Sequence, residues 1–424
     1  MDKLLIEGGV PVSGEVQISG NKNAVLPMIA ACLLTDEEVI LDNVPDIVDL
    51  RVMLEIASML GVENSFENNR LTLRAKDIKT NALSREVCSK VRASILFAGP
   101  LAVRAGSAEL WPPGGDVIGR RRLDAHFYGL RSLGLEVELD GIYKFTCKKR
   151  PKGRELFLDE ASVTATEHIM TVAVLAEGET IIRNAAAEPH VVDLAELLIK
   201  MGALITGLGS NTITITGVEK LHGTEHRVVS DHTEAASFIA LGAATGGSLT
   251  LRGTQPRHYW MARRVFERLG IVFRLDPDSI YLPAEQELRV KPDFGGYTPV
   301  ISDGPWPQFP SDMMSCAIVA ATQAEGSVMF FEKMFESRLY FVDRLISMGA
   351  NAIVCDPHRV VITGRSQLRA QSLSSPDIRA GMAMIIAAAC AKGQSEISNC
   401  RMISRGYENI TNKLQKIGIR LIES

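Results

Sequence analysis

The sequence predicts an α/β protein of two domains in which one unit of about 70 residues is used six times. Three observations predict it. An amphipathic helix that ends in glycine recurs along the chain, two short β-branched runs follow most of these helices, and each unit also contains a helix made almost entirely of small apolar residues.

The amphipathic helix of each unit ends in an apolar residue followed by glycine. A glycine at that place fits a helix C-cap, because glycine adopts the left-handed backbone without steric penalty. The six segments are EIASMLG (55–61), GLRSLG (129–134), ELLIKMG (196–202), VFERLG (265–270), DRLISMG (343–349) and NKLQKIG (412–418).

After most of these caps we expect two strands joined by a tight turn, as in residues 203–217 and 351–364. The second helix of each unit is apolar on all sides, which indicates full burial. The six apolar segments are residues 25–34, 94–103, 169–178, 237–247, 315–326 and 382–393. We therefore expect helices inside and sheets outside in each domain.

The two ends of the chain are expected to complete one another. One strand, GIRLIES (418–424), follows the last cap, whereas residues 1–20 supply strands with no unit before them. We therefore expect a first domain of residues 21–230 and a second domain of residues 1–20 plus 231–424. Two linkers between them would suit a hinge that closes over a cleft.

Composition excludes several classes of protein. The 424 residues are 46% hydrophobic and 23% charged, which is typical of globular chains. A net charge of −4 argues against a general nucleic-acid binder. The seven scattered cysteines predict neither a disulfide framework nor a zinc site and favour a reducing, cytoplasmic location. No signal peptide and no segment of membrane-spanning length is found, so we expect no membrane partner.

The starts of the apolar helices carry an unusual set of polar side chains. Helix N-termini favour anions, so the cations Lys22 and Arg379 predict a bound phosphate or carboxylate. Solvated surface charge is the alternative for any single residue. The set consists of Lys22, Asn23, Arg92, residues 162–166, Asp231, Asp312, Asp377 and Arg379.

Residues 110–126, LWPPGGDVIGRRRLDAH, combine prolines and glycines with three arginines. This composition indicates a lid at residues 111–122, although an exposed connection without a role fits these residues equally well. His222 and His226 have i, i+4 spacing, but the glycine between them disfavours a metal site. We expect no metal and no organic cofactor.

Taken together, the motifs resemble the UDP-N-acetylglucosamine 1-carboxyvinyltransferase family over essentially the whole chain. The resemblance implies two inverse α/β barrel domains, the enolpyruvyl transferase fold, with six βαβαββ-type repeats, three per domain. The motifs are SGNKNAVLP, VRASILFAGPL, PPGGDVIGRRRLDAH, ATEHIM, LAEGETIIRNAAAEPHVVDLAELL, FPSDM, FESR, DIRA and RGYENI.

The resemblance also implies a function. The enzyme would transfer enolpyruvyl from phosphoenolpyruvate to the 3-hydroxyl of UDP-N-acetylglucosamine and release phosphate. This step belongs to peptidoglycan precursor synthesis, and hence to cell-wall biogenesis, cell shape and cell division. The sibling 5-enolpyruvylshikimate-3-phosphate synthase fits the lid and the FPSDM segment less well.

Site residues follow from the same resemblance. Lys22, Arg121 and Arg405 would bind phosphoenolpyruvate, and Asp312 would accept the proton of the attacking hydroxyl. The implied catalytic residues are Asp116, Asp312, Lys22 and Arg405. The implied substrate-binding residues are Lys22, Asn23, Arg92, Arg121, Leu123, Asp124, Ser162, Val163, Thr164, Asp312, Phe335, Asp377, Arg379 and Arg405.

One departure concerns Asp116, which stands where the commonest family pattern has cysteine. An aspartic acid protonates C3 near neutral pH only if its pKa is raised, whereas the adjacent arginines lower it. Our hypothesis is that lid closure desolvates Asp116. Because a carboxylate is a poorer nucleophile than a thiolate toward an epoxide, we also expect insensitivity to fosfomycin.

Three further departures concern the acceptor. Thr164 stands where the family has glycine, His232 where it has arginine, and Ser337 where it has asparagine. They leave open a paralogous enolpyruvyl transferase that acts on another nucleotide or nucleotide sugar. A non-catalytic binding homologue is the remaining alternative.

Overall fold

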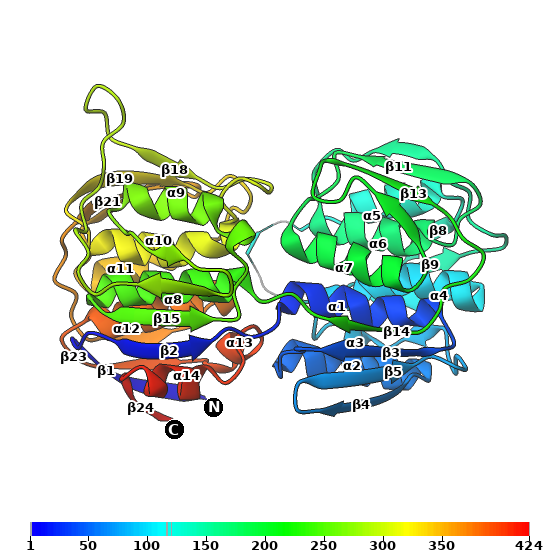
Figure 1. The fold of residues 1–424 in the computed structure, drawn as a ribbon, viewed down its shortest axis with the longest axis horizontal. Helices are drawn as coiled ribbons and strands as arrows, with labels where there is room; N and C mark the ends of the chain where they lie inside the picture. The colour runs from blue at the N-terminus through cyan, green and yellow to red at the C-terminus, as the bar shows by residue number, and fades with distance from the viewer. Residues whose placement is uncertain (1, 116–117, 120, 424) are drawn as a thin grey trace. The chain divides into compact units, whose positions relative to one another are not determined.

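A computed structural model describes residues 2–115, 118–119 and 121–423. These residues form two units. Unit 1 contains residues 2–19, 118–119 and 230–423, and unit 2 contains residues 20–115 and 121–229. Each unit has three four-stranded sheets in its described part (Figure 1). Asp116 lies outside the described residues, so the lid hypothesis stays a prediction.

The order β-α-β-α-β-β occurs five times along the chain, and β1 (Lys3–Gly8) completes the sixth repeat, as the family resemblance implies. The first repeat comprises β2 (Ser13–Gln17), α1 (Lys22–Ala31), β3 (Glu38–Asp42), α2 (Val48–Leu60), β4 (Glu63–Glu67) and β5 (Arg70–Arg74). The second comprises β6 (Ala82–Leu83), η2 (Arg92–Phe97) with α4 (Ala98–Ala105), β7 (Ser107–Leu110), α5 (Asp124–Ser132), β8 (Glu136–Asp140) and β9 (Ile142–Thr146). The third comprises β10 (Glu155–Phe157), α6 (Val163–Ala173), β11 (Glu179–Arg183), α7 (Pro189–Lys200), β12 (Leu204–Thr206) and β13 (Thr212–Thr216). Short helices η1 (Cys32–Leu34) and α3 (Arg85–Cys88) lie between them.

The last three repeats have the same order and end with β24, to which β1 (Lys3–Gly8) is added. The fourth repeat comprises β14 (Thr224–Arg227), α8 (His232–Thr245), β15 (Ser248–Arg252), α9 (Trp260–Arg268), β16 (Arg274–Leu275) and β17 (Ser279–Leu282). The fifth comprises β18 (Val300–Ser302), α10 (Ser311–Thr322), β19 (Gly326–Phe331), α11 (Val342–Ser347), β20 (Ala352–Asp356) and β21 (Arg359–Gly364). The sixth comprises β22 (Ser372–Ser374), α12 (Ile378–Cys390), β23 (Gly393–Ser398), α14 (Ile410–Lys416) and β24 (Arg420–Glu423). Short helices η3 (Pro256–His258) and α13 (Arg401–Ser404) are inserted.

Each sheet has one short parallel edge strand and two antiparallel pairings, as in the order β18-β19-β21-β20. Two edge strands are exchanged between repeats: β2 pairs with β15, and β14 pairs with β3. At the chain ends, β1 pairs antiparallel with β24, with Leu5 opposite Ile422. The expectation that the two ends complete one another is confirmed.

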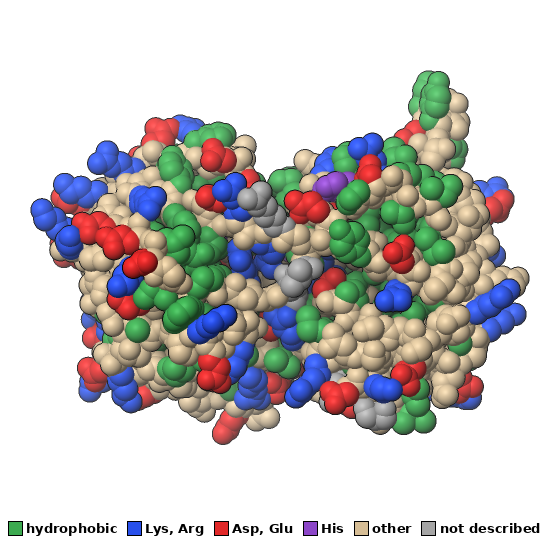
Figure 2. Space-filling model, turned by 180° about the vertical axis from the view of Figure 1, so that it is seen from behind, with side chains coloured by type: hydrophobic (Ala, Val, Ile, Leu, Met, Phe, Trp, Pro, Cys, Tyr) green, Lys and Arg blue, Asp and Glu red, His purple; other side chains and the backbone are tan. Residues whose placement is uncertain are grey.

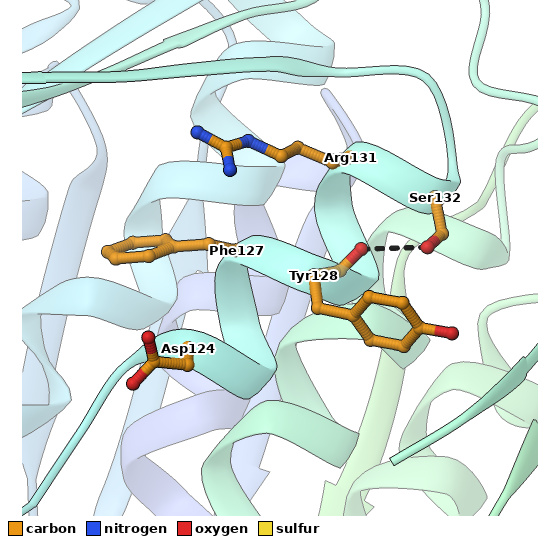
Figure 3. Close-up of a pocket in the computed structure, with 5 residues that line it drawn as sticks. All are labelled: Asp124, Phe127, Tyr128, Arg131 and Ser132. Atoms are coloured by element: carbon orange, nitrogen blue, oxygen red, sulfur yellow. Dashed lines mark hydrogen bonds between the residues drawn. The ribbon is translucent and has the colours of Figure 1, made fainter. Parts of the chain in front are cut away.

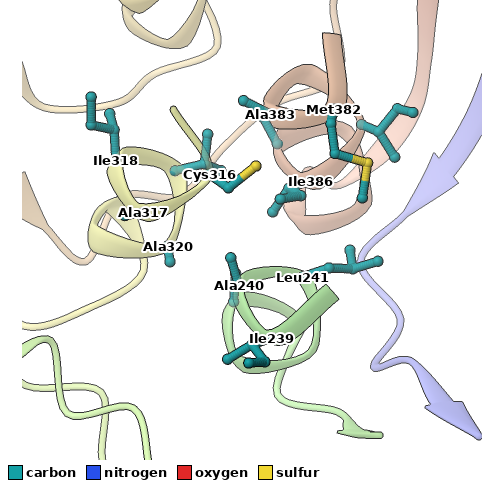
Figure 4. Packing of buried hydrophobic residues seen from close by; sticks show 14 of the residues in the cluster. Ile239, Ala240, Leu241, Cys316, Ala317, Ile318, Ala320, Met382, Ala383 and Ile386 are labelled. Carbon is teal, nitrogen blue, oxygen red and sulfur yellow. The ribbon is translucent and has the colours of Figure 1, made fainter. Parts of the chain in front are cut away.

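The core of unit 1 is formed by α8, α10 and α12, whose side chains interdigitate (Figure 4). Ile239, Ala317 and Ile386 are fully buried. Alanine and glycine on these helices keep the axes close, and each fully buried large aliphatic side chain contributes roughly 1.5–3 kcal/mol. In unit 2 the equivalent segments α1, η2 with α4, and α6 are buried in the same way. The amphipathic outer helices end as predicted, for example at Gly61 with φ 102° and Gly349 with φ 100°.

One loop projects from unit 1 between β17 and β18 and carries hydrophobic side chains at its tip (Figures 1 and 2). Phe294 and Tyr297 of this loop are exposed. Among the described helices, none combines the length and apolar character that a bilayer crossing requires.

Candidate functional site

Three central helices begin with the same side-chain cap. Asn21 Oδ1 accepts hydrogen bonds from the backbone of Asn23 at 2.8 Å and Ala24 at 3.2 Å, before α1. Asp377 Oδ1 accepts from Arg379 N at 2.8 Å and Ala380 N at 2.9 Å, before α12. Asp231 caps α8 in the same way. Asp377 therefore has a structural role in addition to the binding role implied by resemblance.

Lys22, the first residue of α1, is buried and has an anionic partner within unit 2. Its Nζ lies 2.7 Å from Asp49 Oδ2, in the first turn of α2. The sequence predicts a bound anion beside Lys22, and the fold already supplies an anionic partner there, Asp49. Asp49 offsets the charge, so an incoming anion competes with a carboxylate already in place.

Arg92 and Arg121 bring two like charges together in unit 2. The Arg92 guanidinium donates to the carbonyl oxygen of Arg121. Burial, followed by the charge of Arg121, lowers the pKa of Arg92 to about 10. Adjacent cations of this kind create a positive local potential that favours an anion. Leu123, two residues after Arg121 and directly before α5, is buried.

Four other predicted residues of unit 2 lie at the starts of α5 and α6. Asp124 pairs with Arg122 Nε at 2.7 Å, and both side chains are exposed. A surface hollow of about 430 Å³ runs along α5 and contains only Asp124 of the predicted residues (Figure 3). It is otherwise lined by Phe127, Tyr128, Arg131 and Ser132. Ser162 precedes α6, whose first two residues are Val163 and Thr164, and all three are half-buried.

Asp312, at the start of α10 in unit 1, is held by two arginines. One of its oxygens accepts from Arg338, and the other lies 3.1 Å from both Nε and Nη2 of Arg379. Burial alone would raise the pKa of Asp312, but the charges of Arg379 and Arg338 outweigh it and hold the pKa below its ordinary value. Asp312 is therefore ionised at neutral pH.

Both arginines are buried and retain donors for a further acceptor. The Nε of Arg338 and the Nη1 of Arg379 have no hydrogen-bond partner among the described residues. Arg338 lies over the ring of Phe335 at 5.3 Å, and Arg379 lies over the ring of Tyr407 at 5.4 Å. Buried guanidinium N–H groups are seldom left unpaired, so this cluster fits an anionic ligand.

His232 begins α8 next to this cluster. Burial, then the charges of His258 and Arg379, lowers its pKa to about 3. His232 is therefore neutral near pH 7, and the arginine of the family pattern is replaced by an uncharged ring. The His232 ring packs edge-on against Trp306 at 5.6 Å. The third departure at the acceptor, Ser337, is half-buried and directly precedes Arg338.

Two carboxyl groups, Glu332 and Asp303, hold the segment just before Ser337 and Arg338 by hydrogen bonds. Ser311 Oγ donates to Glu332 at 2.8 and 2.9 Å, and the backbone N–H of Lys333 donates to Asp303 at 2.5 Å. Burial, then hydrogen bonding to Asp303, raises the pKa of Glu332 to about 9. Glu332 therefore carries the proton that the two carboxyl groups share, and it connects the start of α10 to residues 332–335.

Within each unit, several predicted residues are close together. Asp312 and Arg379 are in direct contact, and so are Arg92 and Arg121. Arg405 is half-buried directly after α13, and Asn23 is half-buried on α1. Sequence reasoning missed a further set of six residues, although half of them lie in segments already quoted for other reasons: Arg338 in FESR, His126 at the end of the lid segment, and His168 in ATEHIM. The set comprises Arg338, Glu332, Asp303, Asp49, His126 and His168.

No group of three or more His, Cys, Asp or Glu side chains arranged to hold a metal ion occurs in the described parts of the chain.

Comparison with solved structures defines the fold. The enolpyruvyl transferase NikO from Streptomyces tendae matches with a TM-score of 0.87 at 22% identity, over 99% of this chain and 98% of the other. EPSP synthase from Acinetobacter baumannii matches with a TM-score of 0.76 at 18% identity, over the full length of both. The fold is that of the enolpyruvyl transferases.

Sequence comparison is more specific. The family model for EPSP synthase (3-phosphoshikimate 1-carboxyvinyltransferase) matches residues 6–414. The UDP-N-acetylglucosamine 1-carboxyvinyltransferases of Borreliella burgdorferi and Treponema pallidum are each 51% identical to this chain, over 99% and 98% of both sequences respectively. That of Bradyrhizobium diazoefficiens is 49% identical over 98% of this chain and 97% of its own. The chain belongs to the UDP-N-acetylglucosamine 1-carboxyvinyltransferase family.

Proposed function

We propose that this enzyme transfers the enolpyruvyl group of phosphoenolpyruvate to the 3-hydroxyl of UDP-N-acetylglucosamine and releases phosphate. One observation carries the proposal: Asp312 is ionised between two buried arginines, Arg338 and Arg379, that keep donors for a further anion. The cluster supplies a proton acceptor and fixed positive charge at one helix start. About half of the residues are identical to those of a UDP-N-acetylglucosamine 1-carboxyvinyltransferase.

The reaction proceeds by addition and then elimination. The sugar hydroxyl oxygen bonds to C2 of phosphoenolpyruvate, its proton goes to Asp312, and the π electrons of the C2–C3 bond take a proton at C3 from Asp116. In the second stage C3 returns a proton to Asp116, the C2–C3 double bond re-forms, and the C2–O bond to phosphate breaks. The proton held by Asp312 is then released to solvent or to the departing phosphate. Atoms and charge balance without a redox partner.

Cationic side chains stabilise the charge that develops on the departing phosphate. We assign the phosphate and carboxylate of phosphoenolpyruvate to Lys22, Arg121 and Arg405, and we assign Arg92 and Arg379 to the same substrate. The assignment is supported by the like charges of Arg92 and Arg121. The acceptor residues are assigned as follows: Asn23 orients the sugar; Arg121, Leu123, Asp124, Ser162, Val163 and Thr164 hold the uridine diphosphate; and Phe335 and Asp377 complete the acceptor site.

Asp116 is the proposed general acid toward C3. Asp116→Asn is expected to lower kcat and to change its pH profile, and an unchanged rate and profile would remove Asp116 from the mechanism. Because Asp116 replaces a thiol, incubation with fosfomycin should leave the intact mass of the wild type unchanged. Asp116→Cys should gain the mass of one inhibitor molecule, and stoichiometric labelling of the wild type would refute the proposed insensitivity.

The decisive assay is phosphate release from phosphoenolpyruvate with three acceptors offered separately. UDP-N-acetylglucosamine should support turnover, whereas UMP and shikimate 3-phosphate should not. Asp312→Asn should lower kcat by about 100-fold or more, in line with the loss of a general base. Turnover with UMP alone would indicate a paralogue, and no release with any acceptor would indicate a non-catalytic homologue.

The biological role follows from the reaction. Transfer to UDP-N-acetylglucosamine would commit it to peptidoglycan precursors, and thereby to cell-wall biogenesis, cell shape and division. A cytoplasmic location is supported by the seven cysteines, all of which are free thiols.

A further inference from the structure

Two buried histidines in unit 2 form a contact that the proposed mechanism does not use. His126 lies on α5 and His168 on α6, with 2% and 0% of their surfaces exposed. Their Nδ1 atoms are 3.0 Å apart, and the second nitrogen of each ring also has a partner. His126 Nε2 lies 3.0 Å from Thr164 Oγ1, and His168 Nε2 accepts from the backbone N–H of Gly99 at 2.7 Å.

Gly99 sets the direction of this chain of hydrogen bonds. A backbone N–H only donates, so His168 Nε2 is unprotonated and the neutral ring carries its hydrogen on Nδ1. His168 therefore donates to His126 Nδ1. The hydrogen of the neutral His126 ring is then on Nε2, where it is donated to Thr164 Oγ1.

Both rings are neutral near pH 7, which keeps the direction fixed. Burial lowers the pKa of His168 to about 3. Burial, then the charges of His168 and Arg92, lowers the pKa of His126 well below its ordinary value. A doubly protonated ring at either position would leave two N–H groups facing each other between the Nδ1 atoms.

The close approach of His168 to the backbone requires glycine at position 99. A Cβ atom placed on Gly99 would lie 2.7 Å from His168 Nε2 and 2.6 Å from Val172 Cγ2. Neither is a distance that real Cβ contacts show. The absence of a side chain on α4 is therefore what lets the imidazole reach the N–H group.

Thr164 is at the end of the chain of hydrogen bonds. Its oxygen accepts from His126, and its own hydroxyl hydrogen has no acceptor among the described residues. Thr164 is half-buried in the first turn of α6, where the helix dipole favours anions. The oxygen is already used as an acceptor, so the hydroxyl is left as a donor toward solvent or a ligand.

We infer that His126 and His168 are positioning residues that hold the Thr164 hydroxyl as a hydrogen-bond donor to a diphosphate oxygen of the nucleotide-sugar substrate. The inference rests on the proposed function, which places the uridine diphosphate at residues 162–164. It assigns a specific hydrogen bond to the Thr164 side chain, which stands where the family has glycine.

The tautomers test the chain of hydrogen bonds without any substrate. Two-bond ¹⁵N–¹H correlation spectra of histidine-labelled protein should show the proton on Nε2 of His126 and on Nδ1 of His168. The two signals are assigned by their loss in His126→Gln and His168→Leu. The opposite pair of tautomers would overturn the inference.

Binding of UDP-N-acetylglucosamine tests the ligand. Thr164→Val should weaken its affinity, measured by calorimetry, by about 10- to 100-fold, the range for a hydrogen bond to a charged group. Thr164→Ser should retain affinity, and KM for phosphoenolpyruvate should stay unchanged in both. Equal affinity of Thr164→Val and wild type would overturn the inference and leave the proposed function standing.

A double-mutant cycle distinguishes positioning from general support. His168→Leu should weaken binding in the wild type but add nothing to Thr164→Val, because its effect acts through that hydroxyl. Additive losses would overturn the positioning role. If His168→Leu does not fold, the affinities of Thr164→Val and Thr164→Ser still show whether the Thr164 hydroxyl binds the nucleotide sugar. If the wild type releases no phosphate with UDP-N-acetylglucosamine, the proposed function fails and the inference fails with it.

Discussion

Lys22 Nζ lies 2.7 Å from Asp49 Oδ2, and both side chains are buried within unit 2. Removing one partner of a buried ion pair leaves the other charge uncompensated, so Asp49→Asn should lower the free energy of unfolding by about 3 kcal/mol. Inorganic phosphate, the proposed product, should then take the place of the lost carboxylate. We expect phosphate to raise Tm more in Asp49→Asn than in the wild type.

Thermal unfolding with and without phosphate checks this expectation. Asp46→Asn, which removes a partner of exposed Arg51, is the matched control and should respond like the wild type. An equal phosphate response in Asp49→Asn and the wild type would mean that Lys22 is not part of the phosphate pocket.

The charges around Asp312 predict a shift in the pH dependence of kcat. Arg338 is one of two arginines that hold the pKa of Asp312 low, so Arg338→Gln should raise that pKa. A general base must be ionised, and the acid limb of the kcat profile should therefore move to higher pH. Steady-state rates measured across pH check this, with exposed Arg344→Gln as the control. An acid limb that stays in place would argue against Asp312 as the base.

Much of the fold could be predicted because its signals are local. Glycine caps such as Gly61 and the alanine-rich helices repeat at a regular interval, so the two helices of each unit and the strand pair that follows the cap could be predicted without tertiary information. The short parallel edge strands could not be placed in the same way. β6 has only two residues, Ala82 and Leu83, which is too few to show an alternating pattern. The exchange of β2 and β14 between sheets is likewise set by tertiary pairing.

The candidate site was predictable in its cations but not in their partners. Lys22 and Arg379 could be recognised because they sit at helix starts, where a positive charge is unexpected. Asp49 and Asp312, which neutralise them, are 27 and 67 positions away in sequence. Only the fold brings these groups together. The direction of the His126–His168 contact likewise depends on a backbone N–H that no sequence pattern marks.

The Glu332–Asp303 pair predicts a loss of stability at alkaline pH. The folded-state pKa of Glu332 is about 9, above the ordinary value of 4.5, so the folded state keeps a proton that the unfolded state has lost. The stability that protonated Glu332 contributes is complete below pH 4.5 and is lost as pH rises toward 9. The free energy of unfolding then falls by at most about 1.4 kcal/mol per pH unit. Glu332→Gln keeps a donor toward Asp303 and does not ionise.

Urea unfolding at pH 6 and pH 8.5 measures this difference. The wild type should lose more stability between the two values than Glu332→Gln does. Glu325→Gln, which alters an exposed pair with Arg289, should behave like the wild type. Parallel losses in the wild type and Glu332→Gln would show that Glu332 is not the group that titrates.

Asp377 combines a cap with a proposed binding role, and two substitutions separate them. Asp377→Ala removes the acceptor used by the backbone of Arg379 and Ala380, so stability should fall by about 1–2 kcal/mol. Asn caps helices as well as Asp does, so Asp377→Asn should keep that stability. We nevertheless expect it to raise KM for UDP-N-acetylglucosamine, because the carboxylate charge is lost at the acceptor site. Asp231→Asn makes the same change at the cap of α8, and its urea midpoint is the control for the stability measurement. Wild-type kinetics in Asp377→Asn would reduce Asp377 to a cap, since the charge would then contribute nothing that the amide does not.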